Sequence, residues 1–290
     1  MGHLTLVGGV EMKLAVCILS RGNPEALTGV IMGLWRLRSE KHEVVFRVGV
    51  DLDDWRTHQA VERLSAVAEV SVRSGPRPSA RGEVENDILA LQREADAVTL
   101  LTDRTFCITP GWDDFLARGI TEKPTRLLWW SCPNDNMCVM PVISKQWLEA
   151  CSYEWSPEIF PFWFDDTWNQ HIDLLIHGMP SQKVKASYSG IRGKTKRGRD
   201  FAFWIDVFNQ TLPLRVQKAK EMAPKLGVEW QARPDVMQYL EAYSKGMTAN
   251  AEVFQQQFGD SSDPGPEYAI AKERAEKMLA EMSAIREAAQ

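Results

Sequence analysis

The segment that decides the fold is "LLTDRTFCITPGWDDFL", residues 100–116, in which a buried strand stops abruptly at a charged group. An apolar run from Ala97 to Leu101 is typical of a strand buried on both faces of a parallel sheet. Asp103 and Arg104 follow directly, and no predicted helix starts soon enough for Asp103 to cap it. A side chain at a strand end can leave the core while the backbone stays fixed. We therefore expect Asp103 to bind a ligand.

This strand belongs to a series in which strands and helices alternate. Apolar runs predict strands at residues 13–19, 43–50, 68–73 and 95–101. Helical spacing of apolar residues predicts helices at residues 24–39, 56–67 and 82–95. The order predicts an α/β fold with a mostly parallel, Rossmann-like sheet flanked by helices. After these elements we expect further strands at residues 125–130, 136–143 and 183–189, and one short helix at residues 144–151.

The length of 290 residues suits one large domain, or one domain with an extension. Residues 1–12 read as a loose leader, and residues 13–200 as the α/β domain. From Phe201 onward the pattern is mostly helical, which predicts a helical C-terminal extension at residues 201–290.

Bulk composition limits the classes of partner and compartment. A formal net charge of -5 gives the whole chain no attraction to nucleic acid or to an anionic membrane. The 5 cysteines form no CxxC pair and no zinc-finger spacing, so we expect reduced thiols in a cytoplasmic protein. No apolar stretch approaches the ~20 residues that a membrane-spanning helix needs.

Polar and charged residues gather where the predicted strands end. In parallel sheets, ligands bind beyond the carboxyl ends of the strands. Carboxylates there can hold a divalent cation, and the cation can hold a diphosphate. The alternative is that each aspartate caps the helix that follows it, and for Asp54 the two readings are equally good. The candidate residues are Ser20, Arg21, Asp51, Asp53, Asp54, Arg77, Asp103 and Arg104.

A second candidate centre lies in "FWFDDTW", residues 162–168. Asp165 and Asp166 are surrounded by aromatic residues and precede a predicted helix. Exclusion of water by the aromatic rings would raise a carboxyl pKa, whereas the helix N-terminus would lower it, so the sequence does not give the sign of the net shift. N-capping of the helix is the alternative role.

A third candidate is the basic, glycine-broken loop "IRGKTKRGRD", residues 191–200. The loop contains Lys194 and Arg197. It is either a solvated charge run, a lid that closes on a donor diphosphate, or a contact for the phosphates of a nucleic-acid acceptor. The sequence does not separate these readings.

In the order of its motifs, the chain resembles nucleotide-sugar glycosyltransferases of the GT-A fold, especially the inverting family 2 and its phage and bacterial relatives. The resemblance covers residues 13–200, and it rests on the order and spacing of the motifs because no single motif is specific. The matching segments are "LSRGNPEAL", "VGVDLDD", "GPRPSARGEVEND" with Asn86, "LLTDRTFCITPGWDD", "PVISKQWLEA" and "FWFDDTW".

The resemblance implies a role for each candidate. It places Ser20, Arg21 and the cluster from Asp51 to Asp54 at the nucleotide base and ribose. It makes Asp103, helped by Asp53 or Asp54, the ligand of a Mg²⁺ or Mn²⁺ ion that meets the donor diphosphate. It makes Asp166, or else Asp165, the general base that takes a proton from the acceptor hydroxyl.

One departure from the family pattern concerns the metal. Members of the family usually have two or more acids at this strand end, whereas Thr102 and Arg104 flank a single Asp103 here. Either a neighbouring aspartate assists, or the cation is not essential. Arg104 either offsets diphosphate charge or simply pairs with Asp103.

The resemblance implies an enzyme that moves a sugar from a nucleotide-diphosphate sugar, expected to be a UDP-sugar, to a hydroxyl acceptor with inversion. Phage relatives that decorate modified DNA bases make a hydroxymethylated base one candidate acceptor. The alternative is a non-catalytic module that binds a nucleotide-sugar or nucleic acid. A nucleotidyltransferase is a third reading, although "SRGNP" is a poor phosphate-cradling loop.

Overall fold

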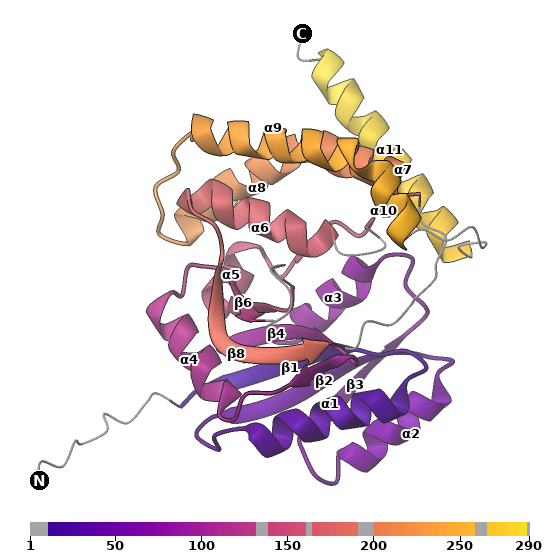
Figure 1. Ribbon diagram of the computed structural model, residues 1–290, viewed down its shortest axis with the longest axis vertical. Coiled ribbons are helices and arrows are strands. Elements are labelled where there is room, and N and C mark those ends of the chain that lie inside the picture. The colour runs from indigo at the N-terminus through magenta and orange to yellow at the C-terminus, as the bar shows by residue number, and fades with distance from the viewer. Residues whose placement is uncertain (1–10, 132–138, 161–163, 191–199, 259–265, 289–290) are drawn as a thin grey trace, which may run out of the picture.

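The computed structural model describes residues 11–131, 139–160, 164–190, 200–258 and 266–288. Within these residues an 8-stranded sheet lies at the centre, and helices lie on both sides of it (Figure 1). The strands are β1 (Lys13–Leu19), β2 (Glu43–Asp51), β3 (Val70–Gly75), β4 (Ala97–Thr102), β5 (Thr105–Cys107), β6 (Leu128–Ser131), β7 (Pro141–Ser144) and β8 (Gln182–Gly190).

The sheet has the order β3-β2-β1-β4-β7-β6-β8-β5. β1 pairs in parallel with both β2 and β4, and β2 pairs in parallel with β3. β7 runs antiparallel to β4 and β6, and the short β5 pairs antiparallel with β8. The predicted α/β fold with a mostly parallel sheet flanked by helices is therefore confirmed.

Helices follow most strands and form a separate layer in the C-terminal part. They are α1 (Pro24–Leu37), α2 (Trp55–Leu64), α3 (Arg81–Ala90), α4 (Trp112–Glu122), α5 (Lys145–Ala150), α6 (Phe164–His177), α7 (Phe201–Gln210), α8 (Leu212–Lys225), α9 (Pro234–Ala249), α10 (Ala251–Phe258) and α11 (Pro266–Ala288). Two elements were not predicted, namely β5 and α4. None of the described helices is both long enough and apolar enough to cross a membrane.

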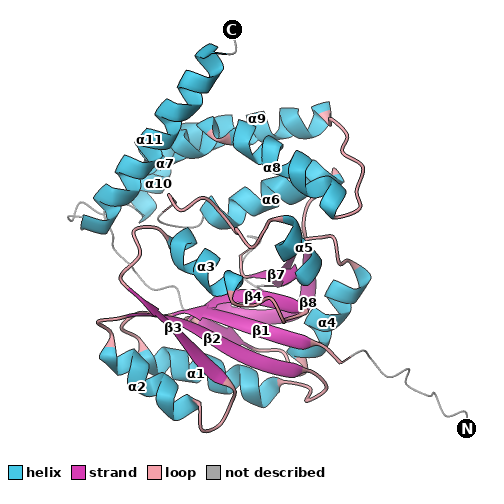
Figure 2. Cartoon of the chain, turned by 180° about the vertical axis from the view of Figure 1, so that it is seen from behind, coloured by secondary structure: helices cyan, strands magenta, loops and turns pink. Residues whose placement is uncertain are grey.

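The two faces of the sheet bury different helices. α1, α2 and α4 pack on one face, and α3 and α5 pack on the other. Figure 2 shows α3 between the sheet and the helical layer. Gly49 on β2 permits this close packing, because a Cβ there would lie 2.9 Å from Ile88 and 3.0 Å from Val84, both on α3. The strand therefore brings α3 directly against the sheet.

Aromatic rings hold the helical layer together. Phe160 lies in the loop before α6, and its ring centroid is 5.5 Å from that of Phe164, 6.1 Å from Trp168, 6.3 Å from Trp204 and 5.9 Å from Phe208. These rings come from the loop before α6, from α6 and from α7, so α6 shares one hydrophobic core with the C-terminal helices. The first turn of α6 is consequently shielded from water.

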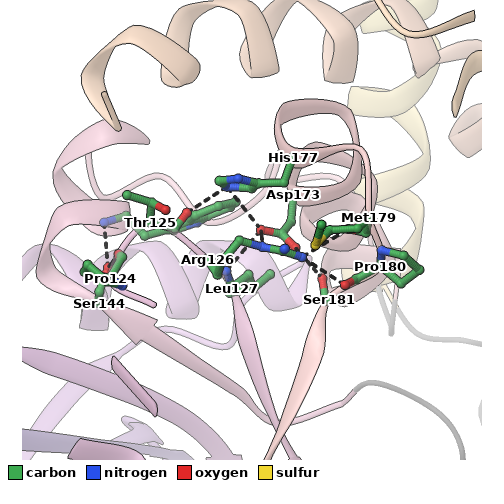
Figure 3. A network of polar contacts seen from close by, with 11 residues as sticks. Pro124, Thr125, Arg126, Leu127, Ser144, Asp173, His177, Met179, Pro180 and Ser181 are labelled. Carbon is green, nitrogen blue, oxygen red and sulfur yellow. Dashed lines mark hydrogen bonds and ion pairs between the residues drawn. The ribbon is translucent and has the colours of Figure 1, made fainter. Parts of the chain in front are cut away.

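A buried ion pair fixes the other end of α6 to the sheet (Figure 3). The Asp173 carboxylate accepts hydrogen bonds from Arg126 Nε at 3.1 Å and Nη2 at 2.8 Å. It also accepts from the backbone N–H of Leu127 at 3.1 Å and from Ser181 Oγ at 2.8 Å. Bidentate, charge-assisted bonds of this kind are among the strongest in proteins.

Both side chains of this ion pair are shielded from solvent. Asp173 is 0% exposed and Arg126 is 7% exposed. Arg126 Nη2 also donates to the carbonyl oxygens of Met179 at 3.0 Å and Pro180 at 2.9 Å. Because Arg126 precedes β6, the network ties α6 and the residues just before β8 to the start of β6.

We predict that Asp173→Asn destabilises the fold by about 3–5 kcal/mol, because it leaves the Arg126 charge buried without a counter-charge. Urea unfolding at neutral pH measures the loss. Glu154→Gln is the matched control, since the Lys218–Glu154 pair has a largely exposed carboxylate and is worth at most about 1 kcal/mol. Equal losses in the two variants would contradict the anchoring role.

Candidate functional site

The carboxyl ends of the parallel strands meet at one edge of the sheet, where the structure brings Ser20 and Asp103 together. Ser20 follows β1 and Asp103 follows β4, and these two strands are neighbours. Ser20 Oγ donates a hydrogen bond to Asp103 Oδ2 at 3.0 Å. Burial raises the pKa of Asp103, and the hydrogen bond from Ser20 and the charge of Arg104 oppose that rise. Asp103 is 8% exposed, so it lies just inside the edge.

The end of β2 supplies a second pair at the same edge. Arg21 Nη1 lies 2.8 Å from Asp51 Oδ2. Burial raises the pKa of Asp51, and the charge of Arg21 opposes the rise. Asp53 is exposed. Asp54 takes the capping role instead, because its side chain accepts from the N–H groups of Thr57 and Gly22.

Arg77 lies in the loop between β3 and α3 and points toward the C-terminal helix. Its Nε is 2.8 Å from Glu267 Oε1 on α11. Arg274 of α11 reaches the same region and donates to Ser79 Oγ at 3.1 Å and Glu83 Oε1 at 2.6 Å. The C-terminal helix therefore holds the loop that borders the strand-end edge. The two remaining candidates, Lys194 and Arg197, lie outside the described residues.

An exposed tryptophan at this edge was missed by sequence reasoning. Trp55 begins α2, directly after the acidic cluster, and is 64% exposed, while nearby Leu52 is 65% exposed. Large apolar side chains so close to charged strand ends suit stacking against a flat ligand such as a nucleobase. The clue in the sequence was a tryptophan at the first helical position after "DLDD".

The second centre is a buried cluster of Arg81 and Glu85 on α3 with Asp165 and Asp166 on α6. Arg81 Nε lies 2.6 Å from Glu85 Oε1 and 3.3 Å from Asp165 Oδ2, and Arg81 Nη1 lies 3.8 Å from Asp166 Oδ2. Glu85 and Asp165 are 0% exposed and Asp166 is 2% exposed. Close packing of α3 against the loop before α6 makes this possible, because a Cβ on Gly82 would lie 2.8 Å from Ser156 Oγ.

The structure gives the direction of the pKa shift at Asp166, which the sequence left open. Burial raises the pKa of Asp166 well above its ordinary value, the charge of Asp165 raises it further, and Arg81 opposes both. Burial and the neighbouring Asp165 charge therefore outweigh the charge of Arg81 at this residue. Arg81 and Glu85 were not among the predicted site residues, since an Arg–Glu pair spaced by four residues usually lies on an exposed helix face.

The described residues show no stand-alone metal site. No group of three or more His, Cys, Asp or Glu side chains in the described part of the chain is arranged to hold a cation. Asp103 is a single carboxylate beside the Ser20 hydroxyl. The residues present therefore fit a divalent cation only if a bound donor supplies further oxygen ligands.

Comparison with solved structures shows which fold this is. The crystal structure of S. aureus TarS 1-349 in complex with UDP has a TM-score of 0.52 and 13% identity, over 85% of this chain and 92% of that chain. Mannosyltransferase PcManGT from Pyrobaculum calidifontis, in complex with GDP-Man and Mn2+, has a TM-score of 0.51 and 13% identity, over 95% of this chain and 81% of that chain. No protein-family model and no curated protein matches the sequence. The likeness shows a glycosyltransferase-type fold.

We predict that Arg81→Gln costs about 3–5 kcal/mol of stability at pH 8, because three buried carboxyl groups lose their guanidinium partner. Arg81 lowers the pKa of Glu85 and of Asp166, so its removal raises both. The folded variant then holds extra protons, and its stability falls more steeply as pH rises. Urea unfolding at pH 5 and pH 8 tests this, with exposed Arg93→Gln as the control. A cost that does not shrink at pH 5 would contradict the cluster's electrostatics.

Proposed function

We propose that this protein is a glycosyltransferase that moves a sugar from a nucleotide-diphosphate sugar to a hydroxyl acceptor. The observation that supports it most is a glycosyltransferase-type fold with a charged strand-end edge and a buried, elevated-pKa aspartate at the start of α6. We take the donor to be a UDP-sugar, because solved structures of similar fold hold UDP and UDP-GlcNAc, although PcManGT holds GDP-Man.

In this proposal the strand-end edge binds the donor. Trp55 stacks on the base, and Arg21 with Asp51 contacts the nucleoside. Arg104 and the Ser20–Asp103 pair face the diphosphate, with Arg77 at the border of the site. Mg²⁺ or Mn²⁺ bound together with the donor would offset the diphosphate charge. Lys194 and Arg197 remain candidates for a cationic cover over the leaving nucleotide.

Asp166 is the proposed general base. Its carboxylate removes the proton from the acceptor hydroxyl, and the oxygen attacks the anomeric carbon as the bond to the diphosphate breaks. One displacement of this kind inverts the configuration. A raised pKa suits the role, because a stronger base takes the hydroxyl proton more readily. The acceptor is proposed as an open class of hydroxyl compounds, among which a hydroxymethylated DNA base is one candidate.

A second candidate function is a non-catalytic nucleotide-sugar or nucleic-acid binding module. Two observations favour it: the single carboxylate at Asp103, and the 0% and 2% exposure of Asp165 and Asp166. Both functions fit a cytoplasmic setting, which we propose from the reduced, buried thiols of Cys17, Cys107 and Cys151.

We predict that Mn²⁺ strengthens UDP binding and that Asp103→Asn removes this metal-dependent gain. The melting temperature should not fall, because burial disfavours the Asp103 charge and asparagine can still accept from Ser20. Calorimetric titration of UDP in Mn²⁺ and in EDTA measures the gain. Glu62→Gln, a neutralisation of an exposed carboxylate on α2, is the control. Equal UDP affinity in Mn²⁺ and EDTA would remove the cation from the mechanism.

We predict that Asp166→Asn keeps the fold and donor affinity but lowers transfer by ~10²–10⁴-fold, the usual cost of losing a general base. Asp165→Asn should lose much less. In the wild type, transfer should fall as pH drops through the raised pKa of Asp166, well above the ordinary 3.8. Rates of nucleotide release across pH test both statements. If Asp165→Asn is the more damaging change, Asp165 is the base; if neither slows transfer, the base lies elsewhere.

A further inference from the structure

Glu85 on α3 is a buried acid that the proposed reaction does not use. It is 0% exposed, and its Oε1 accepts from Arg81 Nε at 2.6 Å. α3 packs on β1 at this point, where the charge of Glu85 acts on the buried Cys17 thiol. A carboxyl group so far from water needs either a full set of partners or a proton.

The charges around Glu85 do not balance if every acid is ionised. Three carboxyl groups, those of Glu85, Asp165 and Asp166, surround the one guanidinium of Arg81 in the described part of the chain. Full ionisation would place a net charge of about -2, from three negative groups and one positive group, at a site where all three carboxyl groups are buried, which is strongly unfavourable. At least one of the three acids must therefore hold a proton.

The unused hydrogen-bonding capacity of the three carboxyl groups indicates which of them holds the proton. Glu85 Oε2, both carboxyl oxygens of Asp165, and Asp166 Oδ1 have no hydrogen-bond partner among the described residues. Two neighbouring carboxyl groups in this state are satisfied when one is protonated and donates to the other. Arg81 already donates to Glu85 Oε1, which leaves Oε2 as the position for the proton.

We propose that Glu85 is a positioning residue for the base. It stays protonated, and its O–H group donates a hydrogen bond to Asp165. Asp166 is then the acid that exchanges a proton with the acceptor. Asp165 then accepts from Glu85 and also contacts Arg81, whose Nε lies 3.3 Å from Asp165 Oδ2. The role in catalysis rests on the proposed function, whereas the proton on Glu85 does not.

The groups that face Glu85 agree with this assignment. Burial raises the pKa of Glu85 well above its ordinary value, Arg81 opposes the rise, and Asp165 and Asp166 on α6 add to it. From β1 the facing group is the Cys17 thiol, whose pKa burial raises, so it stays neutral. Among the described residues, Arg81 is the cation that lowers the pKa of Glu85 most.

The first experiment measures unfolding as a function of pH and needs no activity. Unfolded Glu85 ionises near pH 4.3, whereas folded Glu85 keeps its proton, so this residue makes stability fall as pH rises. One extra proton in the folded state raises the unfolding constant about tenfold per pH unit. Glu85→Gln mimics a protonated carboxyl group but cannot ionise, so it lacks this pH dependence. The ratio of the wild-type unfolding constant to that of the variant should therefore rise about tenfold per pH unit above about pH 5. Glu94→Gln, an exposed control, should follow the wild type.

The outcome against the proposal is equally clear. If Glu85→Gln does not fold, or if its unfolding constant follows the wild-type pH dependence, Glu85 does not hold the proton. Because urea unfolding is read without substrate, this result stands whether or not the protein transfers sugar.

The second experiment is the pH profile of sugar transfer, which a merely structural role would not shift. Glu85→Ala removes the donor that stabilises the charge of Asp165. Because that charge raises the pKa of Asp166, its loss lowers the pKa of Asp166 and moves the acid limb of the transfer profile to lower pH. Glu85→Gln restores the donor and the wild-type limb. The positioning role would be overturned if the acid limb of Glu85→Ala lay at the wild-type pH, or if the acid limb of Glu85→Gln shifted as far as that of Glu85→Ala. Absence of transfer in the wild type would overturn the proposed function, and the positioning role with it.

Discussion

The rest of the candidate site depends on the contacts that the Arg81 guanidinium makes with the buried carboxyl groups of α3 and α6. Arg81 stands at the start of α3, a helix packed on the sheet, and it contacts both aspartates at the start of α6. It therefore joins the sheet to the helical layer at the point where we place the base. About two turns further along α6, the Arg126–Asp173 pair ties the helix to the sheet again. α6 is held at both ends by buried arginine–carboxylate contacts, and its first turn keeps a defined position.

The same burial has opposite effects on stability and on chemistry. Removing carboxyl groups from water is unfavourable, and aromatic rings from the loop before α6, from α6 and from α7 keep water away from this turn. The cost is offset by Arg81 and, in our proposal, by a retained proton. What remains is one aspartate with a raised pKa, which is the property that a general base needs. At the strand-end edge, Asp103 and Asp51 also have raised pKa values but lie closer to solvent, which suits ligand binding.

Much of the fold was predictable because β1, β2 and β4 are largely apolar and buried, and the first four strands alternate with helices. The meeting of Ser20 and Asp103 follows directly, since β1 and β4 are parallel neighbours. The 3-residue β5 was not predictable, because its pairing partner β8 lies far along the chain. The role of Asp54 as a cap was undecidable, because a cap and a ligand occupy the same sequence position.

The candidate site was less predictable for a physical reason. Arg81 and Glu85 have the spacing of an exposed helix pair, but packing of α3 against the sheet and against the first turn of α6 encloses them. The sign of the pKa shift at Asp166 depends on how deeply the residue is buried and on how close Asp165 and Arg81 lie to it. The local pattern predicts which residues carry charge, whereas tertiary packing determines which of them lose water.

The central claim is sugar transfer, and the most direct measurement is turnover of a panel of UDP-sugars with Mn²⁺ present. Hydroxymethylated DNA and simple glycosides serve as the two sets of acceptors, and mass spectrometry reads the products. A transferase releases UDP and adds the mass of one sugar residue to an acceptor. Binding of a UDP-sugar without release of UDP, whatever the acceptor, would contradict the claim and identify a binding module.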